Sequence, residues 1–405
     1  MESLGAPCPA WMVTRFEEAG GTISFRRFME LALHDPDHGA YGAGILRVGP
    51  DGDFVTSPSM GPDFAALLAL QLVQWFDQLA VLHPEAPLCL VDIGPGEGDL
   101  AADLITELNR LQPEWLDRLE LILVELNQGM AARQRKRLDQ VDSLAVTWRS
   151  LEQLSSQPLI GVFLAHELLD ALPVERLVNR EGELNQLLVT AAMGSDQTVR
   201  LQWAEQPLPE ALEQQLQWAE HQCDLVLPPA GAPEGWTTEW HHSVPDWLQS
   251  AAGALGHGVL LIVDYAHEAA RYYSALRSAG TLLAYRHQKV SNDLLGQAGL
   301  TDLTAHLCID TLIAQARQRG WLCLGHCRQG EALLSLGLAE RLHNLQRLPT
   351  DQLALALQRR EALLRLVDPG ALGDFRWIAL QRCRDLSDDP LPLQARFLEP
   401  PSEIS

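Results

Sequence analysis

Three polar side chains follow an apolar run in the segment FLAHELLDALP, residues 163–173. His166, Glu167 and Asp170 stand within five residues of one another. Side chains of these types can bind a cation, pass on a proton, hold a metal ion or cap a helix. The residue types alone leave all four roles open.

Glu167 and Asp170 are three residues apart, so their carboxylates would share one face if the chain turns helically after the strand. Two carboxylates can bind a planar guanidinium at two points and accept its proton. The structural alternative is that Asp170 caps a helix and Glu167 forms an ion pair. His166 would orient a carboxylate, relay a proton or simply pack. We expect no metal here, because no further His or Cys lies at ligand spacing.

A glycine-rich segment, VDIGPGEGDL (91–100), lies at an expected strand-to-helix turn. Its spacing is D-x-G-x-G-x-G, with Asp92 followed by Gly94, Gly96 and Gly98. Glycines let the backbone turn tightly and approach a ligand, and ligands of open parallel sheets bind at the carboxyl ends of the strands. The segment is therefore the best candidate for a ligand-binding loop.

The same spacing argues against two common phosphate ligands. In the dinucleotide pattern G-x-G-x-x-G, Gly94 and Gly96 fit, but Asp99 takes the place of the third glycine and would occupy the space of a pyrophosphate. The chain also lacks G-x-x-x-x-G-K-[ST], which excludes a P-loop. The loop favours a ligand with a nucleoside and a cationic or zwitterionic end, and S-adenosylmethionine is such a ligand.

Apolar runs alternate with helical patterns around this loop, which predicts a parallel sheet covered on both faces. The expected strands are 88–93, 119–125, 143–148, 159–165 and 258–265. The expected helices are 57–81, capped by Ser57 or Ser59 with Pro62 in its first turn, 99–111, capped by Asp99, and 127–139. An insertion at about 174–257 predicts antiparallel strands (174–203) and a helix (205–221). After residue 330 the pattern is helical, and we expect the last twenty residues to be frayed.

Composition limits the classes of partner. With 30 basic and 53 acidic residues among 405, the net charge is −23, which disfavours nucleic acid and anionic membranes. No apolar run approaches the ~18 residues of a membrane helix, and seven scattered cysteines predict reduced thiols. Cys323 and Cys327 flank His326 but lack the further ligands of a zinc site. The N-terminus shows no signal or presequence pattern, so the expected location is cytoplasmic.

The glycine loop resembles motif I of the class I S-adenosylmethionine-dependent methyltransferases. In that class an acidic residue at the end of the second strand binds both ribose hydroxyls. Glu125 stands at that position, at the end of LELILVE (119–125). The resemblance thus implies cofactor binding by Asp92, the three glycines and Glu125, with Glu152 or a neighbour as a candidate contact for adenine.

Further segments are similar to the MidA-like family, whose mitochondrial members are complex I assembly arginine methyltransferases. They are ISFRRFMELALHDPDHGAY (23–41), GDFVTSP (52–58), HELLDALP (166–173), Asp264-Tyr265, DLTAH (302–306), Gln329-Gly330 and RLVDPGALGDF (365–375). The resemblance covers about residues 15–380 and adds Thr56 to the implied cofactor-binding residues. The chain departs from the family at His166, where Asn is usual, and at Ala40, Ser59 and Ala266.

The resemblance implies a class I, Rossmann-like α/β methyltransferase fold with a mostly parallel seven-stranded sheet. We expect a helical N-terminal extension (1–85), a methyltransferase core with the insertion (86–330), and a helical C-terminal region (331–405). The implied activity is N-methylation of an arginine in a complex I-type NADH dehydrogenase subunit. Glu167, Asp170 and His166 would be the catalytic residues, and the chain could form a homodimer.

Two further clusters and two alternative functions remain open. Asp302 and His306 could line a substrate cleft or cap the next helix. Glu239, between Trp236 and Trp240, could offer an acidic, aromatic lip to a cationic peptide. One alternative is a small-molecule methyltransferase with residues 174–257 as a lid. The other is a non-catalytic assembly factor, against which the intact loop and carboxylates argue.

Overall fold

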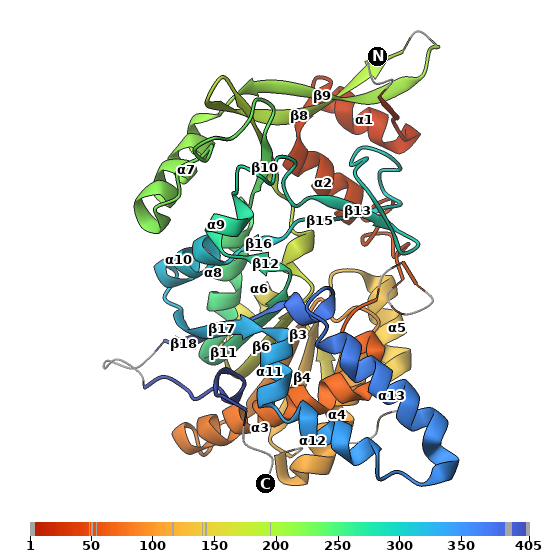
Figure 1. The fold of residues 1–405 in the computed structure, drawn as a ribbon, viewed down its shortest axis with the longest axis vertical. Helices are drawn as coiled ribbons and strands as arrows, with labels where there is room; N and C mark the ends of the chain where they lie inside the picture. Colours follow the sequence, from red (N-terminus) through yellow and green to blue (C-terminus); the bar gives the residue numbers. More distant parts are fainter. Residues whose placement is uncertain are drawn as a thin grey trace. The chain divides into compact units, whose positions relative to one another are not determined.

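The computed structural model describes residues 5–47, 49, 52–53, 55–115, 117–139, 141, 144–194, 196–384 and 391–401 (Figure 1). The chain forms two compact units, each assembled from three separate stretches. Unit 1 comprises Met1–Arg47, Leu169–Asp246 and Ala266–Gln315, and unit 2 comprises Val48–Leu168, Trp247–Tyr265 and Ala316–Ser405. These boundaries differ from the three predicted segments, because strands of the N-terminal stretch pair with strands of the insertion.

Unit 2 is built on a seven-stranded sheet with the order β17-β18-β11-β6-β3-β4-β5 (Figure 1). Its strands are β3 (Leu88–Ile93), β4 (Leu119–Val124), β5 (Ala145–Trp148), β6 (Leu159–His166), β11 (Leu255–Asp264), β17 (Leu322–Arg328) and β18 (Arg376–Cys383). Neighbouring strands are parallel except for β18, which is antiparallel to both β11 and β17. The predicted mostly parallel, seven-stranded sheet is confirmed.

The five apolar runs predicted as strands form β3, β4, β5, β6 and β11, with ends that differ by at most three residues. Ser143, at the start of the predicted third strand, lies outside the described residues. The sequence did not predict β17 and β18. Gly325 and His326 interrupt the apolar character of β17, which lies half-buried at the edge of the sheet. Pairing with β18, rather than a local pattern, makes it a strand.

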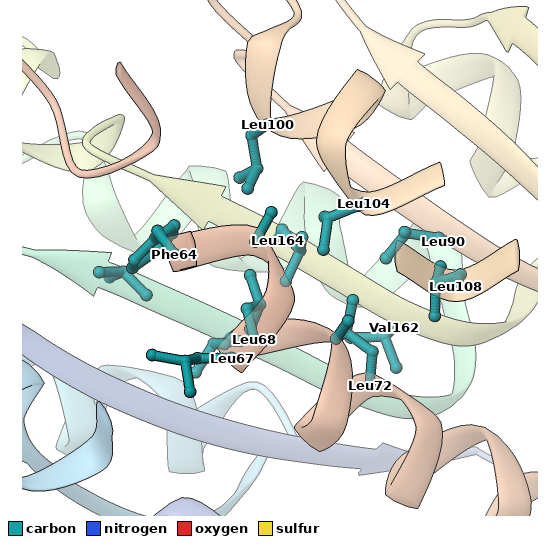
Figure 2. Packing of buried hydrophobic residues seen from close by; sticks show 14 of the residues in the cluster. Phe64, Leu67, Leu68, Leu72, Leu90, Leu100, Leu104, Leu108, Val162 and Leu164 are labelled. Carbon is teal, nitrogen blue, oxygen red and sulfur yellow. The ribbon is translucent and has the colours of Figure 1, made fainter. Parts of the chain in front are cut away.

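The helices of unit 2 are α3 (Pro62–Leu82), α4 (Asp99–Leu111), α5 (Gln128–Leu138), α6 (Leu151–Ser155), α11 (Gln329–Ser335), α12 (Leu338–Leu345) and α13 (Leu353–Leu366). Leucines of α3 and α4 pack against Val162 and Leu164 of β6 to form the hydrophobic core (Figure 2). Two predicted caps are wrong. Gly61 precedes α3 and Gly98 precedes α4, so Pro62 and Asp99 are the first helical residues.

α3 is long and apolar enough, by length and composition, to cross a membrane, and it is the one such helix among the described residues. The expectation that no run reaches this length is therefore wrong. Most of the apolar side chains of α3, from Phe64 to Leu79, are buried in the core of unit 2. Core helices of soluble proteins meet the same criterion, so the composition of α3 is explained by this burial.

The C-terminal region is only partly helical. α11, α12 and α13 agree with the expected helices, but β18 follows them and joins the sheet. Residues 391–401, expected to be frayed, include Leu393 and Phe397, which are buried in the same core as α3. That expectation is wrong for the described part of the tail, because these two apolar side chains anchor it.

Unit 1 contains an antiparallel sheet with the order β1-β9-β8-β7-β10, in which β2 also pairs with β8. Its strands are β1 (Ala6–Pro7), β2 (Thr22–Ser24), β7 (Glu175–Arg180), β8 (Glu183–Met193), β9 (Val199–Pro207) and β10 (Thr237–Trp240). The helices around it are α1 (Ala10–Glu18), α2 (Phe25–His34) and α7 (Glu210–Cys223), and α8 (Val244–Ala254) continues into unit 2. The insertion thus has the expected antiparallel strands and helix.

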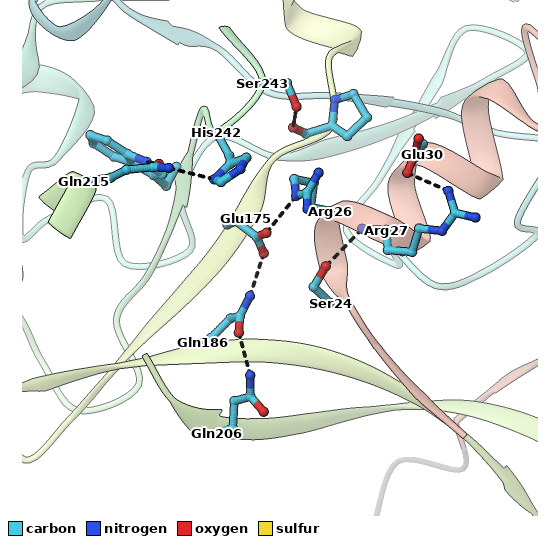
Figure 3. A network of polar contacts seen from close by, with 12 residues as sticks. Ser24, Arg26, Arg27, Glu30, Glu175, Gln186, Gln206, Gln215, His242 and Ser243 are labelled. Carbon is cyan, nitrogen blue, oxygen red and sulfur yellow. Dashed lines mark hydrogen bonds and ion pairs between the residues drawn. The ribbon is translucent and has the colours of Figure 1, made fainter. Parts of the chain in front are cut away.

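A polar chain crosses three strands of this sheet (Figure 3). Glu175 of β7 accepts hydrogen bonds from Arg26 of α2 at 2.8 Å and from Gln186 of β8 at 2.8 Å. Gln186 in turn accepts one from Gln206 of β9 at 2.8 Å. Each buried polar group has a partner, so the network fixes α2 and the three strands in one register.

The rest of unit 1 follows β11. Short strands β13 (Leu283–Arg286), β14 (Lys289–Ser291) and β15 (Asp302–Thr304) form a three-stranded antiparallel sheet. A second pair joins β12 (Ala266–His267) and β16 (Leu307–Cys308) in parallel. α9 (Ala269–Tyr272) and α10 (Ile309–Gln318) flank these strands along the chain.

A buried carboxylate links three helices of unit 2, and its removal should destabilise the fold. Asp63 of α3 forms ion pairs with Arg341 of α12 and Arg359 of α13. Burial alone would raise the pKa of Asp63, but hydrogen bonds and charge from the two arginines lower it overall. We expect Asp63→Asn to reduce the free energy of unfolding by about 2 kcal/mol, below the range for a fully buried pair because the arginines reach water.

Urea unfolding at pH 7 measures this effect. Glu361→Gln is the matched control, because Glu361 is an exposed carboxylate on α13. Equal destabilisation by both changes would contradict a structural role for the Asp63 ion pairs.

Candidate functional site

The glycine loop joins β3 to α4 in a conformation that side chains disfavour. Gly94, Gly96 and Gly98 have φ angles of 71°, 54° and 86°, in the left-handed region that glycine tolerates best. A Cβ on Gly94 would also lie 2.7 Å from Cδ1 of Leu168. The backbone NH of Gly94 donates to the carbonyl of Val124 at 3.0 Å, which ties the loop to the end of β4.

Gln134 of α5 connects this loop to the candidate ribose-binding carboxylate. Its buried amide donates to the carbonyl of Gly96 at 2.8 Å and to Glu125 at 3.0 Å. The indole NH of Trp148, at the end of β5, donates to the amide oxygen of Gln134 at 3.0 Å. The side chain of Gln134 therefore fixes the position of the glycine loop relative to the end of β4.

Sequence reasoning missed Gln134. The available signal is its spacing, since Met130, Gln134 and Leu138 recur every fourth residue and all three are buried. A polar side chain in that row had to find partners in the interior. Its place in the basic stretch of residues 133–137 concealed this signal.

Asp92 and Glu125 are suited to a ligand with a cationic end and hydroxyl groups. Asp92 is 2% exposed, and among the described residues its Oδ2 has no hydrogen-bond partner. Burial, and then the negative charge of Glu125, raise the pKa of Asp92 to about 7. A bound cation would offset this cost, and Glu125 has oxygens that can accept from a diol. These residues fit S-adenosylmethionine, although their individual roles stay predictions.

Glu167 follows the end of β6 in a fixed position. Its φ angle is 48°, and its backbone NH donates to the carbonyl of Val263 at 2.8 Å. Its Oε1 accepts from the backbone NH of Ser57 at 3.4 Å and lies 3.5 Å from Nδ1 of His166. The carboxylate is nearly buried, and it sits at the same edge of the sheet as the glycine loop.

His166 itself is an uncharged imidazole. Burial lowers its pKa to about 3, so it is neutral near pH 7. Its ring meets that of Phe64 edge to face, with 5.3 Å between centroids. The low pKa and this contact favour the packing role over the proton relay.

The GDFVTSP segment reaches Glu167 through the backbone NH of Ser57, which follows Thr56. Phe54 of this segment lies outside the described residues, whereas Thr56 is buried and bonded to Ser59 through its backbone. Ser57 is fully buried, and its Oγ lies 3.0 Å from Nε2 of Gln329. The cofactor contact of Thr56 stays a prediction.

Gln329 makes an unusual number of hydrogen bonds for one side chain. Its amide nitrogen also donates to the carbonyls of Leu366 and Leu372 at 3.1 and 3.0 Å, and its oxygen accepts from the indole of Trp377 at 3.3 Å. The residue is 0% exposed. Gln329 therefore anchors Ser57, and through it the backbone NH that holds Glu167, to the C-terminal region.

Asp170 belongs to unit 1, whereas Glu167 belongs to unit 2. The predicted helical turn is limited to the 3-10 helix Leu169–Ala171, and Glu167 precedes it in a left-handed conformation. Three peptide links keep the two Cα atoms within about 10 Å, whatever the arrangement of the units. The pairing of the two carboxylates stays a prediction.

Within unit 1, Asp170 lies near the second candidate cluster. Its carbonyl accepts from the backbone NH of Ala305 at 2.9 Å. Burial raises the pKa of Tyr285, and the charges of Asp170 and Asp302 raise it further. Asp302 also accepts from the hydroxyl of Tyr41 at 2.9 Å. The DLTAH segment therefore lies beside Asp170 and does not cap α10, which begins at residue 309.

Other candidates from the sequence lie elsewhere. Glu239 is 0% exposed and accepts from the backbone NH of Thr281 at 2.8 Å, while Trp236 and Trp240 are buried beside it. The expected acidic, aromatic lip is therefore wrong, because these side chains form a core.

His306 contacts His267 at 3.1 Å between ring nitrogens. Glu152 is exposed on α6, and its contact to adenine stays a prediction.

Within the part of the chain that the structure describes, no group of three or more His, Cys, Asp or Glu is placed to hold a metal ion. Cys323, His326 and Cys327 lie along the edge strand β17, and both cysteines are free thiols.

The raised pKa of Asp92 predicts pH-dependent binding of S-adenosylmethionine. The ionised carboxylate attracts a cation, and its population rises through pH 7. We expect calorimetry to show about tenfold tighter binding at pH 8 than at pH 6. Asp92→Asn should bind weakly at both pH values. The control, Asp99→Asn, removes a more exposed carboxylate from the same turn; a pH dependence that survives in Asp92→Asn would refute the assignment.

The lowered pKa of His166 predicts how stability changes with pH. The unfolded histidine takes up a proton below pH 6.5 and the folded one does not, so stability is lost as the pH falls. Between pH 7 and pH 5 we expect the wild type to lose about 2 kcal/mol more than His166→Asn. Urea unfolding at both pH values measures this, with the exposed His343→Asn as control. Equal losses in the wild type and His166→Asn would show that His166 is not the buried titrating group.

Comparison with known proteins identifies relatives of similar length. A zebrafish (Danio rerio) protein named "Protein arginine methyltransferase NDUFAF7, mitochondrial" is 25% identical over 376 residues, covering 88% of this chain and 82% of that protein. Its human counterpart is 24% identical and covers 89% and 80%. The expected cytoplasmic location is contradicted by these relatives, which are named as mitochondrial proteins.

A solved structure supports the fold and the cofactor. The crystal structure of a protein from Burkholderia thailandensis bound to S-adenosyl-homocysteine has a TM-score of 0.82 and 25% identity. The match covers 98% of this chain and 99% of that one. The predicted class I fold, the cofactor S-adenosylmethionine and the methyltransferase activity are thereby confirmed. Residues 67–327 match the model of the family described as "Putative S-adenosyl-L-methionine-dependent methyltransferase", and the chain belongs to this family.

Proposed function

We propose that this methyltransferase modifies an arginine side chain of a protein, and that this protein is a subunit of a complex I-type NADH dehydrogenase. The main support for this proposal is the nearly buried carboxylate of Glu167, which lies at the same edge of the sheet as the glycine loop. The names of the relatives, protein arginine methyltransferases, support the proposal. The resemblance to the complex I assembly family supports the choice of substrate.

An arginine substrate needs a carboxylate because its guanidinium has a pKa above about 12 and arrives charged. S-adenosylmethionine supplies a methyl group on a sulfonium, which is lost to the attacking nitrogen as the carbon–sulfur bond breaks. Glu167 would hold the guanidinium, orient one nitrogen and accept the proton that this nitrogen releases. The backbone NH of Ser57 fixes Glu167 in place, so little order remains to be gained when substrate binds.

Asp170 would supply the second carboxylate of the clamp, as its sequence position predicts. In unit 1, the nearby Asp302 would add negative charge to the surroundings of Asp170. Acidic surroundings favour a cationic side chain over a neutral small molecule. This charge is the reason to prefer a protein arginine to the small-molecule alternative.

Substitution of the two carboxylates tests the proposed clamp. Glu167→Gln and Asp170→Asn should each lower kcat by at least about a hundredfold, because the guanidinium loses its acceptor. Calorimetry should show unchanged affinity for S-adenosylmethionine in both variants. Glu220→Gln, an exposed carboxylate on α7, is the matched control. Near-normal turnover in both variants would refute the assignment.

The substrate is identified by incubating the protein with labelled S-adenosylmethionine and lysate from cells that lack its gene. Mass spectrometry should find methylated arginine in a dehydrogenase subunit. Methyl groups on lysine, or on no protein at all, would overturn the proposal, the latter in favour of a small-molecule substrate. The Glu167→Gln variant serves as the negative control.

A further inference from the structure

The side chain of Gln329 uses every hydrogen-bonding position that it has. Its Nε2 lies 3.1 Å from the carbonyl oxygen of Leu366, 3.0 Å from that of Leu372 and 3.0 Å from the hydroxyl oxygen of Ser57. Its Oε1 lies 3.3 Å from the indole nitrogen of Trp377 and 3.2 Å from the same hydroxyl. Three oxygens therefore surround a nitrogen that carries only two hydrogens.

The chemistry of the three oxygens decides which of them receive these hydrogens. A carbonyl oxygen can only accept, so Leu366 and Leu372 take both hydrogens of Nε2. The hydroxyl of Ser57 can donate, and it therefore donates its own hydrogen to Oε1 of Gln329. The opposite orientation of the amide is excluded, because it would place Oε1 against two carbonyl oxygens and Nε2 against the indole NH of Trp377.

This hydroxyl bond fixes the orientation of Ser57, which is 0% exposed. With a φ angle of −55° and a ψ angle of −43°, Ser57 is helical and precedes the 3-10 helix η1 (Pro58–Met60). Its side chain is bonded to Gln329, and its backbone NH donates to Oε1 of Glu167 at 3.4 Å. Because one residue makes both bonds, a rotation of Ser57 that broke the first would also move its NH group away from Glu167.

Gln329 is itself held in place by the backbone. Its NH donates to the carbonyl of Phe375 at 2.8 Å, and it is the first residue of α11. The two carbonyls that it binds belong to the last residue of α13 and to the first residue of the 3-10 helix η5 (Leu372–Asp374). The side chain is 0% exposed, so Gln329 can influence the reaction only through the residues that it contacts.

The orientation of the Glu167 carboxylate matters because methyl transfer is an in-line displacement. The attacking nitrogen must lie in line with the carbon–sulfur bond, and a displacement of about 1 Å can lower the rate about a hundredfold. An NH donor restricts the rotation of a carboxylate and so reduces the number of orientations in which it could hold the guanidinium.

We propose that Gln329 is a positioning residue for methyl transfer and that it acts through Ser57 on the carboxylate of Glu167. The inference rests on the proposed function in one respect, namely that Glu167 holds the substrate guanidinium. It adds that the rate of the transfer depends on the C-terminal region, to which a single amide connects Glu167.

Two substitutions test this role. Gln329→Met removes every hydrogen bond of the amide at a similar side-chain length, whereas Ser57→Ala removes only the hydroxyl and keeps the bonds of Gln329 to both carbonyls. Methylation of arginine is followed with labelled S-adenosylmethionine and increasing amounts of lysate from cells that lack the gene. We expect both variants to lower the maximal rate about tenfold. The amount of lysate that gives half the maximal rate, and the calorimetric affinity for S-adenosylmethionine, should stay within about twofold.

Gln71→Met is the matched control for a general loss of stability. Gln71 is also a 0% exposed glutamine of unit 2, and its amide donates to Gln74 at 2.9 Å and accepts from the backbone NH of Phe397 at 3.1 Å. Neither bond involves Ser57, so we expect a lower thermal midpoint with an unchanged maximal rate. If Gln71→Met lowered the rate as much as Gln329→Met, general destabilisation would explain both results and the inference would be refuted.

Combination with Glu167→Gln shows whether the effect passes through Glu167. In that variant we expect the addition of Ser57→Ala to cause less than about a twofold further loss of rate. A further tenfold loss, or a normal maximal rate in both single variants, would overturn the inference and leave the proposed function intact. Near-normal turnover of Glu167→Gln would refute the proposed clamp and this inference with it. If Gln329→Met does not fold, Ser57→Ala decides the outcome.

Discussion

Parallel pairing of β3 with β4 on one side and β6 on the other brings three strand ends to one edge of the sheet. The glycine loop, Glu125 and Glu167 follow these strands directly. Residues more than seventy positions apart in the chain are thus brought to one edge by the pairing of strands. If one of these strands slipped by a single residue, its side chains would turn to the opposite face and its terminal carboxylate would leave the site.

Two buried amides secure what the strands bring together. Gln134 links the loop to Glu125, and Gln329 links Ser57 to the C-terminal region. An amide suits this task because it donates and accepts without carrying charge into the interior. Each amide is bonded at both its nitrogen and its oxygen, so its burial carries little desolvation penalty. The carboxylates of Asp92 and Glu125 are therefore not needed to hold the loop, and they are available to bind a ligand.

Buried ionisable groups in both units have shifted pKa values. In unit 2, burial raises the pKa of Asp92 and of the half-buried Glu125, and the negative charge of Glu125 raises that of Asp92 further. A cationic ligand would relieve that cost. In unit 1, burial raises the pKa of Tyr285, and the charges of Asp170 and Asp302 raise it further.

The sequence by itself determined the elements with a strong local pattern. The five continuous apolar strands, the glycine loop and the antiparallel insertion all follow from period and composition, and α4 has the predicted range, Asp99–Leu111, although its cap is Gly98. Local signals succeeded there because burial on both faces requires an unbroken apolar run, and a left-handed turn requires glycine. Motif resemblance added the cofactor and the number of strands in the sheet.

Tertiary structure decided the rest. β17 is a strand because β18 lies beside it, and the tail is ordered because Leu393 and Phe397 fill a core built by distant helices. Glu239 is buried, although its neighbours in sequence would suit a binding lip equally well. Gln134 acquires its role through partners 9 to 38 residues away, and Gln329 through partners more than thirty residues away. Such roles depend on pair contacts across the chain, and a single sequence records the residues without recording which of them meet.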